Sequence, residues 1–126
     1  MKALLVNCTL KASPERSNTE ALADVVADAL REGGVEVAAG RAVDHSIPPG
    51  VESEMGEGDE WPAIRSQILD PEILLFATKG PGPSDSYLES EEGREWSHST
   101  GRAAAANLLA VARALEGKPI PAPPSE

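Results

Sequence analysis

Apolar positions along the chain form two kinds of pattern, short uninterrupted runs and longer stretches with helical spacing. The short runs have the length of buried parallel strands, and the longer stretches repeat every three or four residues. The predicted strands are residues 2–8, 35–43 and 72–78, and the predicted helices are residues 21–32, 61–69 and 98–115. Strands that alternate with helices indicate an α/β protein with a parallel sheet and helices on its faces.

Local signals support these elements. Ser17 and Glu20 have the spacing of a capping box before the first helix, and Gly33-Gly34 follow its last turn. Asp59 is a candidate cap for the second helix. The run at residues 72–78 is apolar enough to predict a strand that is buried on both faces of the sheet.

The composition favours a single globular domain. The chain has 126 residues, 40% of them hydrophobic and 25% charged, and we predict one domain over residues 1–116. The Pro-rich segment 117–126 is expected to be disordered. The net charge of -10 argues against nucleic acid and anionic membranes as partners. No segment has the pattern of a signal peptide or a membrane span, so a cytoplasmic protein is expected.

Neither a metal site nor a catalytic nucleophile is predicted. The carboxylates of residues 44–60 lack the spacing of a calcium loop, and we expect a solvated acidic loop there. Cys8 is the only cysteine, and its place in an apolar run predicts a buried small side chain rather than a reactive thiol. His98 lies between Ser97 and Ser99, which as sequence neighbours on a helix do not face it, so these serines are expected to cap the last helix.

The polar stretch after the first strand is a candidate anion site. Thr9 offers a hydroxyl and Lys11 a positive charge, and Ser17, Asn18 and Thr19 offer donors at the start of a helix. Because the first amides of a helix lack internal partners and carry partial positive charge, this arrangement suits a phosphate monoester. The alternative is that the serine and threonines only cap the helix. The stretch contains neither a Walker P-loop nor a dinucleotide fingerprint.

The segment KALLVNCTLKASPERSNTEALADVV resembles the opening of the flavodoxin-like NAD(P)H-dependent FMN reductases. In that family the first strand leads into a Ser/Thr-rich loop that holds the FMN phosphate. The resemblance covers residues 1–78 and 79–115. It implies a flavodoxin-like three-layer parallel sheet, FMN as cofactor and NAD(P)H as co-substrate. It also implies that the phosphate is bound by Thr9, Lys11, Ser17, Asn18 and Thr19.

The same resemblance implies that the middle of the domain is missing. Thr78 is followed at once by KGPGPSDSYLE, which looks like the segment after the family's fifth strand. The predicted sheet is therefore truncated to about three strands in the order 2-1-3. Of the family's flavin-ring contacts, only the strand end at Thr78 carries over. Tyr87 or Trp96 could cover a ring, but packing in the core or in a lid is the favoured role for both.

Two functions stay open at this point. The first is an FMN-binding relative of the NAD(P)H-dependent FMN reductases, with flavin and nicotinamide as its small-molecule partners. The second is a non-catalytic truncated remnant or small assembly module that lacks the flavin-ring loops. A sheet of order 2-1-3 leaves the third strand as a bare apolar edge, so a homodimer through residues 73–78 is expected.

Overall fold

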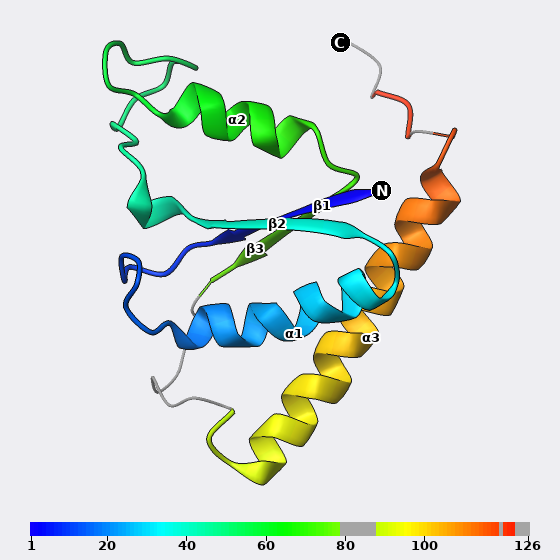
Figure 1. Ribbon diagram of the computed structural model, residues 1–126. Helices are drawn as coiled ribbons and strands as arrows, with labels where there is room; N and C mark the ends of the chain where they lie inside the picture. Colours follow the sequence, from blue (N-terminus) through cyan, green and yellow to red (C-terminus); the bar gives the residue numbers. More distant parts are fainter. Residues whose placement is uncertain (79–87, 119, 123–126) are drawn as a thin grey trace.

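A computed structural model describes residues 1–78, 88–118 and 120–122 (Figure 1). In these residues, strands and helices alternate as the sequence predicts. The elements are β1 (Lys2–Asn7), α1 (Asn18–Glu32), β2 (Glu36–Arg41), a 3-10 turn η1 (Ala42–Asp44), α2 (Trp61–Leu69), β3 (Ile73–Ala77) and α3 (Glu91–Leu115). The acidic segment between η1 and α2 forms a loop, as expected.

The three strands form one parallel sheet in the order β2-β1-β3, which confirms the predicted order. β1 lies in the centre, where Leu5 pairs with Ala39 of β2 on one side and with Leu75 of β3 on the other. All three strands point the same way, so their carboxyl ends lie at one edge of the sheet. Loops that follow the strands therefore gather at that edge.

Helix α1 ends where the sequence predicts and begins three residues before the predicted range, directly after the predicted cap. The Oγ of Ser17 accepts a hydrogen bond from the Glu20 N–H at 3.1 Å, which confirms the cap. The Glu20 carboxylate accepts a hydrogen bond from Arg41 and does not complete a capping box with Ser17. Gly33 ends the helix, and Gly34 follows with φ of 86°, a conformation that favours glycine.

Helix α3 begins earlier than predicted, at Glu91. Its cap is Ser90, whose Oγ accepts the Gly93 N–H at 3.0 Å. The predicted caps were wrong, because Ser97 and Ser99 lie inside the helix and donate hydrogen bonds to carbonyls three residues back. At the start of α2 the carboxylate of the residue before the cap, Asp59, accepts the Trp61 N–H at 2.8 Å.

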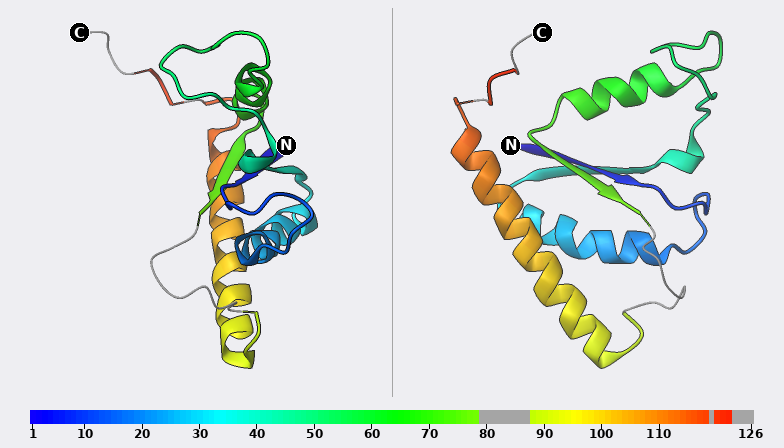
Figure 2. Two further views of the ribbon diagram at one scale, coloured as in Figure 1. Left: turned by 90° about the vertical axis from the view of Figure 1, so that its left-hand side faces the viewer. Right: turned by 180° about the vertical axis from the view of Figure 1, so that it is seen from behind.

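The core lies between the sheet and the two long helices. Figure 2 shows α1 and α3 on the same side of the sheet, and side chains from both helices pack there. The buried residues are Ala3, Leu5, Ala23, Ala27, Leu30, Val35, Ile73 and Ala105. We call this side the covered face. The covered face buries the apolar sides of α1 and α3 and every second residue of the strands.

The opposite side of the sheet, which we call the open face, is only thinly covered. α2 lies over it (Figure 1), yet none of the residues of α2 is buried. A cavity of about 200 Å³ lies between the C-terminal end of α2 and the sheet, and is lined by residues that include Leu4, Ala38 and Gln67. Leu74 is 37% exposed and Phe76 is 52% exposed. The prediction that β3 is buried on both faces was therefore wrong.

Some expectations fall on residues outside the description. Tyr87 lies there, as do Pro119 and residues 123–126 of the predicted disordered tail. Residues 120–122 belong to neither a helix nor a strand. Among the helices in the described ranges, none combines the length and the apolar character that crossing a membrane requires.

Candidate functional site

Asn7, at the carboxyl end of β1, organises the loop that leads to α1. Its side chain is 1% exposed. The Oδ1 of Asn7 accepts the Thr9 N–H at 3.1 Å, and its Nδ2 donates to the Oγ of Ser17 at 3.5 Å. The Oγ1 of Thr9 in turn accepts the Lys11 N–H at 3.3 Å. These bonds bring Thr9, Lys11 and Ser17 together around one buried amide.

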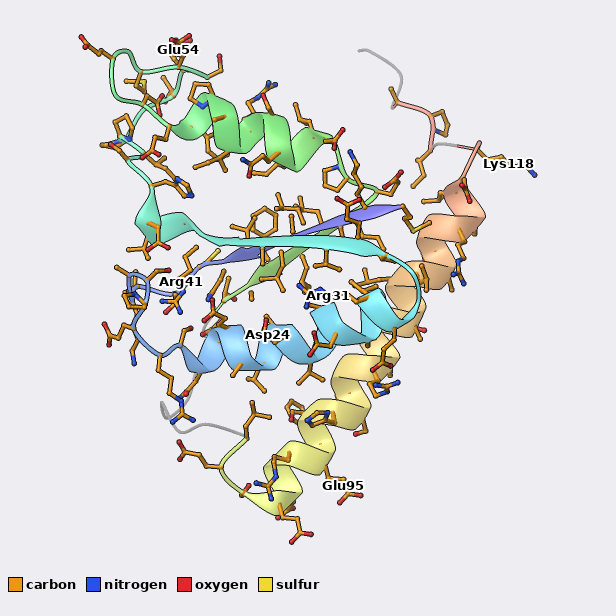
Figure 3. The ribbon with its side chains drawn as sticks, viewed as in Figure 1. Asp24, Arg31, Arg41, Glu54, Glu95 and Lys118 are labelled. Carbon is orange, nitrogen blue, oxygen red and sulfur yellow. The ribbon has the colours of Figure 1, made fainter. Side chains whose placement is uncertain are left out.

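Arg41, at the end of β2, lies beside the same loop and stabilises it (Figure 3). Its side chain is 6% exposed and makes two hydrogen bonds to the Glu20 carboxylate, at 3.2 and 2.6 Å. A third bond, at 3.0 Å, runs to the Lys11 carbonyl. The hydrogen bond from Arg41 lowers the pKa of Glu20 below its ordinary value. The guanidinium therefore links β2, the loop and the start of α1.

A second tether joins the middle of the loop to η1. The backbone N–H and the hydroxyl of Ser13 donate to the Asp44 carboxylate at 2.8 and 2.6 Å. The hydrogen bond from the Ser13 hydroxyl lowers the pKa of Asp44 most, and the hydrogen bond from the Ser13 N–H lowers it further. The loop is thus held at three places, by Asn7, Arg41 and Asp44.

The charge of Lys11 stays close to the loop. Its Nζ donates to the Arg16 carbonyl at 3.2 Å and lies 3.6 Å from the Glu15 carboxylate. The Lys11 side chain is about half exposed, and so is the carboxylate beside it. An exposed pair of this kind contributes little free energy, so the ammonium can turn to an anion at small cost.

The remaining predicted site residues lie at the same end of the molecule. Ser17 is buried, and because its Oγ already accepts two hydrogen bonds, its hydroxyl hydrogen is the group left to donate. Asn18 and Thr19 are half-buried in the first turn of α1. Thr78 is exposed directly after β3, where the Ala77 carbonyl accepts the Cys8 N–H at 2.8 Å.

Two side chains lie in different surroundings from those predicted. Cys8 is exposed rather than buried, because β1 ends at Asn7 and Cys8 already belongs to the loop. Trp96 is 54% exposed on α3, so it does not pack in the core, and its packing in a lid stays a prediction. Among the described residues, no group of three or more histidine, cysteine or acidic side chains could hold a metal ion.

The site residues predicted from the sequence do not include Asn7 and Arg41, two buried polar residues that hold the loop. Each had a weak signal. Asn7 interrupts an apolar run at its end, and Arg41 is the charged residue that closes a run rich in valine and alanine. Buried polar groups need partners, so a polar residue at the end of a buried strand indicates a hydrogen-bonded loop. The identity of the partners depends on the fold.

Two curated proteins are each similar to part of this chain. In the 8-demethyl-8-aminoriboflavin-5'-phosphate synthase of Streptomyces davaonensis, 87 aligned residues are 32% identical, covering 62% of this chain and 34% of that protein. A divalent metal cation transporter, MntH, of Mycobacterium bovis is 46% identical over 80 residues, which cover 60% of this chain and 12% of that protein. The chain thus matches at most about a third of the length of either curated relative. No family model matches.

A solved structure matches nearly the whole chain. It is the crystal structure of RosB with a bound intermediate, 8-demethyl-8-formylriboflavin-5'-phosphate. The TM-score is 0.80 at 19% identity, and the match covers 95% of this chain and 82% of RosB. In the part of the chain that the structure describes, the fold is therefore α/β and flavodoxin-like, shortened to three strands in the order 2-1-3. A place among the NAD(P)H-dependent FMN reductases stays a prediction.

Proposed function

We propose that this chain binds FMN through its phosphate, at the loop between β1 and α1. The observation that carries the proposal is the loop itself, which Asn7, Arg41 and Asp44 hold in place at the carboxyl edge of a parallel sheet. Ligands of open α/β folds bind outside this edge. A loop that is already ordered loses little conformational entropy when it takes up a ligand.

The donors at the loop fit a phosphate monoester. The first turn of α1 directs backbone N–H groups and the positive end of its dipole toward the loop. Lys11 adds a positive charge that the exposed Glu15 only partly offsets. The remaining donors are the hydroxyls of Thr9, Ser17 and Thr19 and the amide of Asn18. Ser17 contributes chiefly by holding the start of the helix in place.

The similar proteins point to the same ligand class. The Streptomyces davaonensis relative and the RosB structure both carry riboflavin-5'-phosphate derivatives in their names. Each of these molecules has the phosphate that the loop would take up. The proposal therefore rests on two supports, the donor set of the loop and the flavin phosphates of similar proteins.

The flavin ring would have fewer contacts than the phosphate. Thr78 lies at the same edge and would contact the ring side of the ligand. If about 4 kcal/mol of ring contacts are absent, the affinity is lower by roughly a thousandfold than in a complete site. We therefore propose weak binding that depends on the phosphate.

The relation to NAD(P)H-dependent FMN reductases extends this proposal to an activity. Bound FMN supplies the hydride-accepting chemistry, and NAD(P)H would be the co-substrate. The chain itself would hold the phosphate and leave the ring open to a nicotinamide. The second candidate is a non-catalytic module that keeps only the phosphate site, and the exposed Leu74 and Phe76 of the open face favour it.

A fluorescence titration tests the proposal. FMN and riboflavin, which lacks the phosphate, are each titrated with the chain and with the Lys11→Gln variant. We expect saturable quenching of FMN, little quenching of riboflavin, and an FMN dissociation constant about tenfold higher in the variant, because a charge-assisted hydrogen bond is lost.

Lys118→Gln is the matched control, since it removes the same charge from an exposed residue after α3 and should leave FMN binding unchanged. Equal quenching of FMN and riboflavin would contradict the phosphate site. NADPH oxidation measured with FMN-saturated protein then separates the two candidates. Turnover above that of free FMN supports the reductase, and its absence supports the non-catalytic module.

A further inference from the structure

The outer edge of β3 carries backbone hydrogen-bonding groups that no other described strand pairs with. β3 pairs with β1 on one side, and no described strand pairs with it on the other. The Ala77 carbonyl bonds to Cys8 beside β1, so the backbone groups of Ala77 face inward. Because these groups alternate along a strand, the N–H and C=O groups of Leu74 and Phe76 face outward. An edge of this kind readily pairs with another strand.

The sequence of β3 offers no protection against such pairing. All five residues, ILLFA, are apolar, with neither a charge nor a proline. The other edge of the sheet, β2, differs in this respect because it contains Glu36, Gly40 and Arg41. The side chains of Leu74 and Phe76 are also exposed on the open face. The β3 edge is therefore the side of the sheet that is suited to association.

Helix α3 presents an uncharged flank on the same side of the molecule. Arg102 donates to Glu32 at 2.6 Å and Arg113 donates to the Gly33 carbonyl at 3.2 Å, so the flank with these arginines faces α1. The opposite flank, about half a helical turn away, carries Val111 and Leu115, both exposed. Figure 2 shows β3 and α3 together on one side, away from β2. Residues 103–112 contain no charged side chain.

We propose that this surface binds a second copy of the chain, with the two β3 strands antiparallel around Leu75. Two identical edges related by a two-fold axis meet in this way. Leu74 of each copy then lies opposite Phe76 of the other, and these residues exchange their outward backbone hydrogen bonds. Leu75 faces Leu75 across the axis. The product is a six-stranded sheet in the order 2-1-3-3-1-2.

The self-complementarity of β3 argues for a second copy as the occupant. Leu74 and Phe76 share the open face, so the pairing places each aromatic ring beside a leucine on that face. The uncharged flanks of the two α3 helices come together on the covered face. The paired strands are apolar and the paired flanks of α3 are uncharged, so neither part of the interface buries one of the chain's many carboxylates.

Light scattering coupled to size exclusion tests the proposal over a range of protein concentrations. We expect the mass of two copies, with a dissociation constant raised at least about a hundredfold by Phe76→Lys, because two aromatic contacts are lost. Val51→Lys, at a loop residue that is 98% exposed, adds the same charge and should leave the dimer intact. A single-copy mass at every concentration would overturn the proposal, and so would a mass that grows without limit.

Cross-linking tests the register independently of any effect of Phe76→Lys on folding. In a Cys8→Ser background, Leu75→Cys places two thiols across the axis in a non-hydrogen-bonded pair, about 4.5 Å apart at Cα, which permits a disulfide. We expect rapid formation of a covalent dimer on mild oxidation. Val51→Cys in the same background is the control. Equal rates in the two variants, or no covalent dimer with Leu75→Cys, would overturn the antiparallel pairing.

Discussion

The two faces of the sheet differ sharply although the same strands supply both. On the covered face, Ala3, Leu5 and Ile73 pack against α1 and α3 and are almost fully buried. On the open face, Leu74 and Phe76 remain exposed beneath α2, which buries none of its own residues. Adjacent residues of β3 therefore have opposite surroundings. An uninterrupted apolar run shows which strand is in the sheet, but not how many of its faces are covered.

The two faces also have different roles: the covered face stabilises the fold, and the open face is suited to association. The covered face contains the core, and the Arg41–Glu20 pair at its edge fastens the candidate phosphate loop. The open face buries Leu4 but leaves Leu74 and Phe76 exposed, and these two residues are available to a second copy of the chain. Substitutions on the two faces should therefore affect different measurements.

The largest expected effect comes from a matched pair on β3. Ile73→Ala removes a side chain that is 3% exposed and should lower the free energy of unfolding by about 3 kcal/mol. Leu74→Ala, at the next residue, should cost at most about 1.5 kcal/mol in the monomer, since Leu74 is 37% exposed. Urea unfolding at low protein concentration measures both. Equal losses would contradict the contrast between the faces.

Arg41→Met should give the next largest effect. The substitution removes three hydrogen bonds and leaves Glu20 without its cation, so we expect a loss of about 2 kcal/mol. Arg31→Met is the control, because Arg31 pairs with Asp28 within α1, both side chains are largely exposed, and the loss should cost under about 0.5 kcal/mol. Hydrogen exchange should also show faster exchange in the loop at residues 9–16 for Arg41→Met alone.

The pH dependence of stability should give the smallest effect. The pKa values of Glu20 and Asp44 are lowered in the folded chain from 4.5 and 3.8, by bonds from Arg41 and Ser13. Their contribution is complete above these ordinary values and is lost as the pH falls through the lowered pKa values. Glu20→Gln should make the acid-induced loss shallower by under about 1 kcal/mol, because the carboxylate is 40% exposed. Urea unfolding at about pH 6 and about pH 3 measures this loss. If the free energy of unfolding falls equally in the original chain and in Glu20→Gln, the Arg41–Glu20 pair does not contribute to the pH dependence.

Much of the fold could be predicted from local signals. The cap at Ser17, the glycines after α1 and the three apolar runs each act within a few residues, and the structure confirms them. The start of α3 could not be located in this way, because Gly93 and the acidic residues around it resemble a loop. Glu91 and Glu92 instead lie in the first turn, where the helix dipole favours negative charge.

The candidate site was predicted less completely than the fold. Thr9, Lys11 and Ser17 do lie together, because one loop connects them. Arg41 is distant in sequence, and its bonds to Glu20 and Lys11 depend on β2 lying beside β1. Cys8 was placed wrongly because a single residue at the end of a strand decides between burial and exposure.

The exposed thiol of Cys8 allows the central claim to be tested at the site itself. The chain's only cysteine lies between Asn7 and Thr9, at the start of the loop. The rate of alkylation by iodoacetamide is measured with no addition, with FMN and with riboflavin. A phosphate site in this loop predicts that FMN slows the reaction in a saturable way and that riboflavin at the same concentration does not. Alkylation at the same rate with and without FMN would contradict the account.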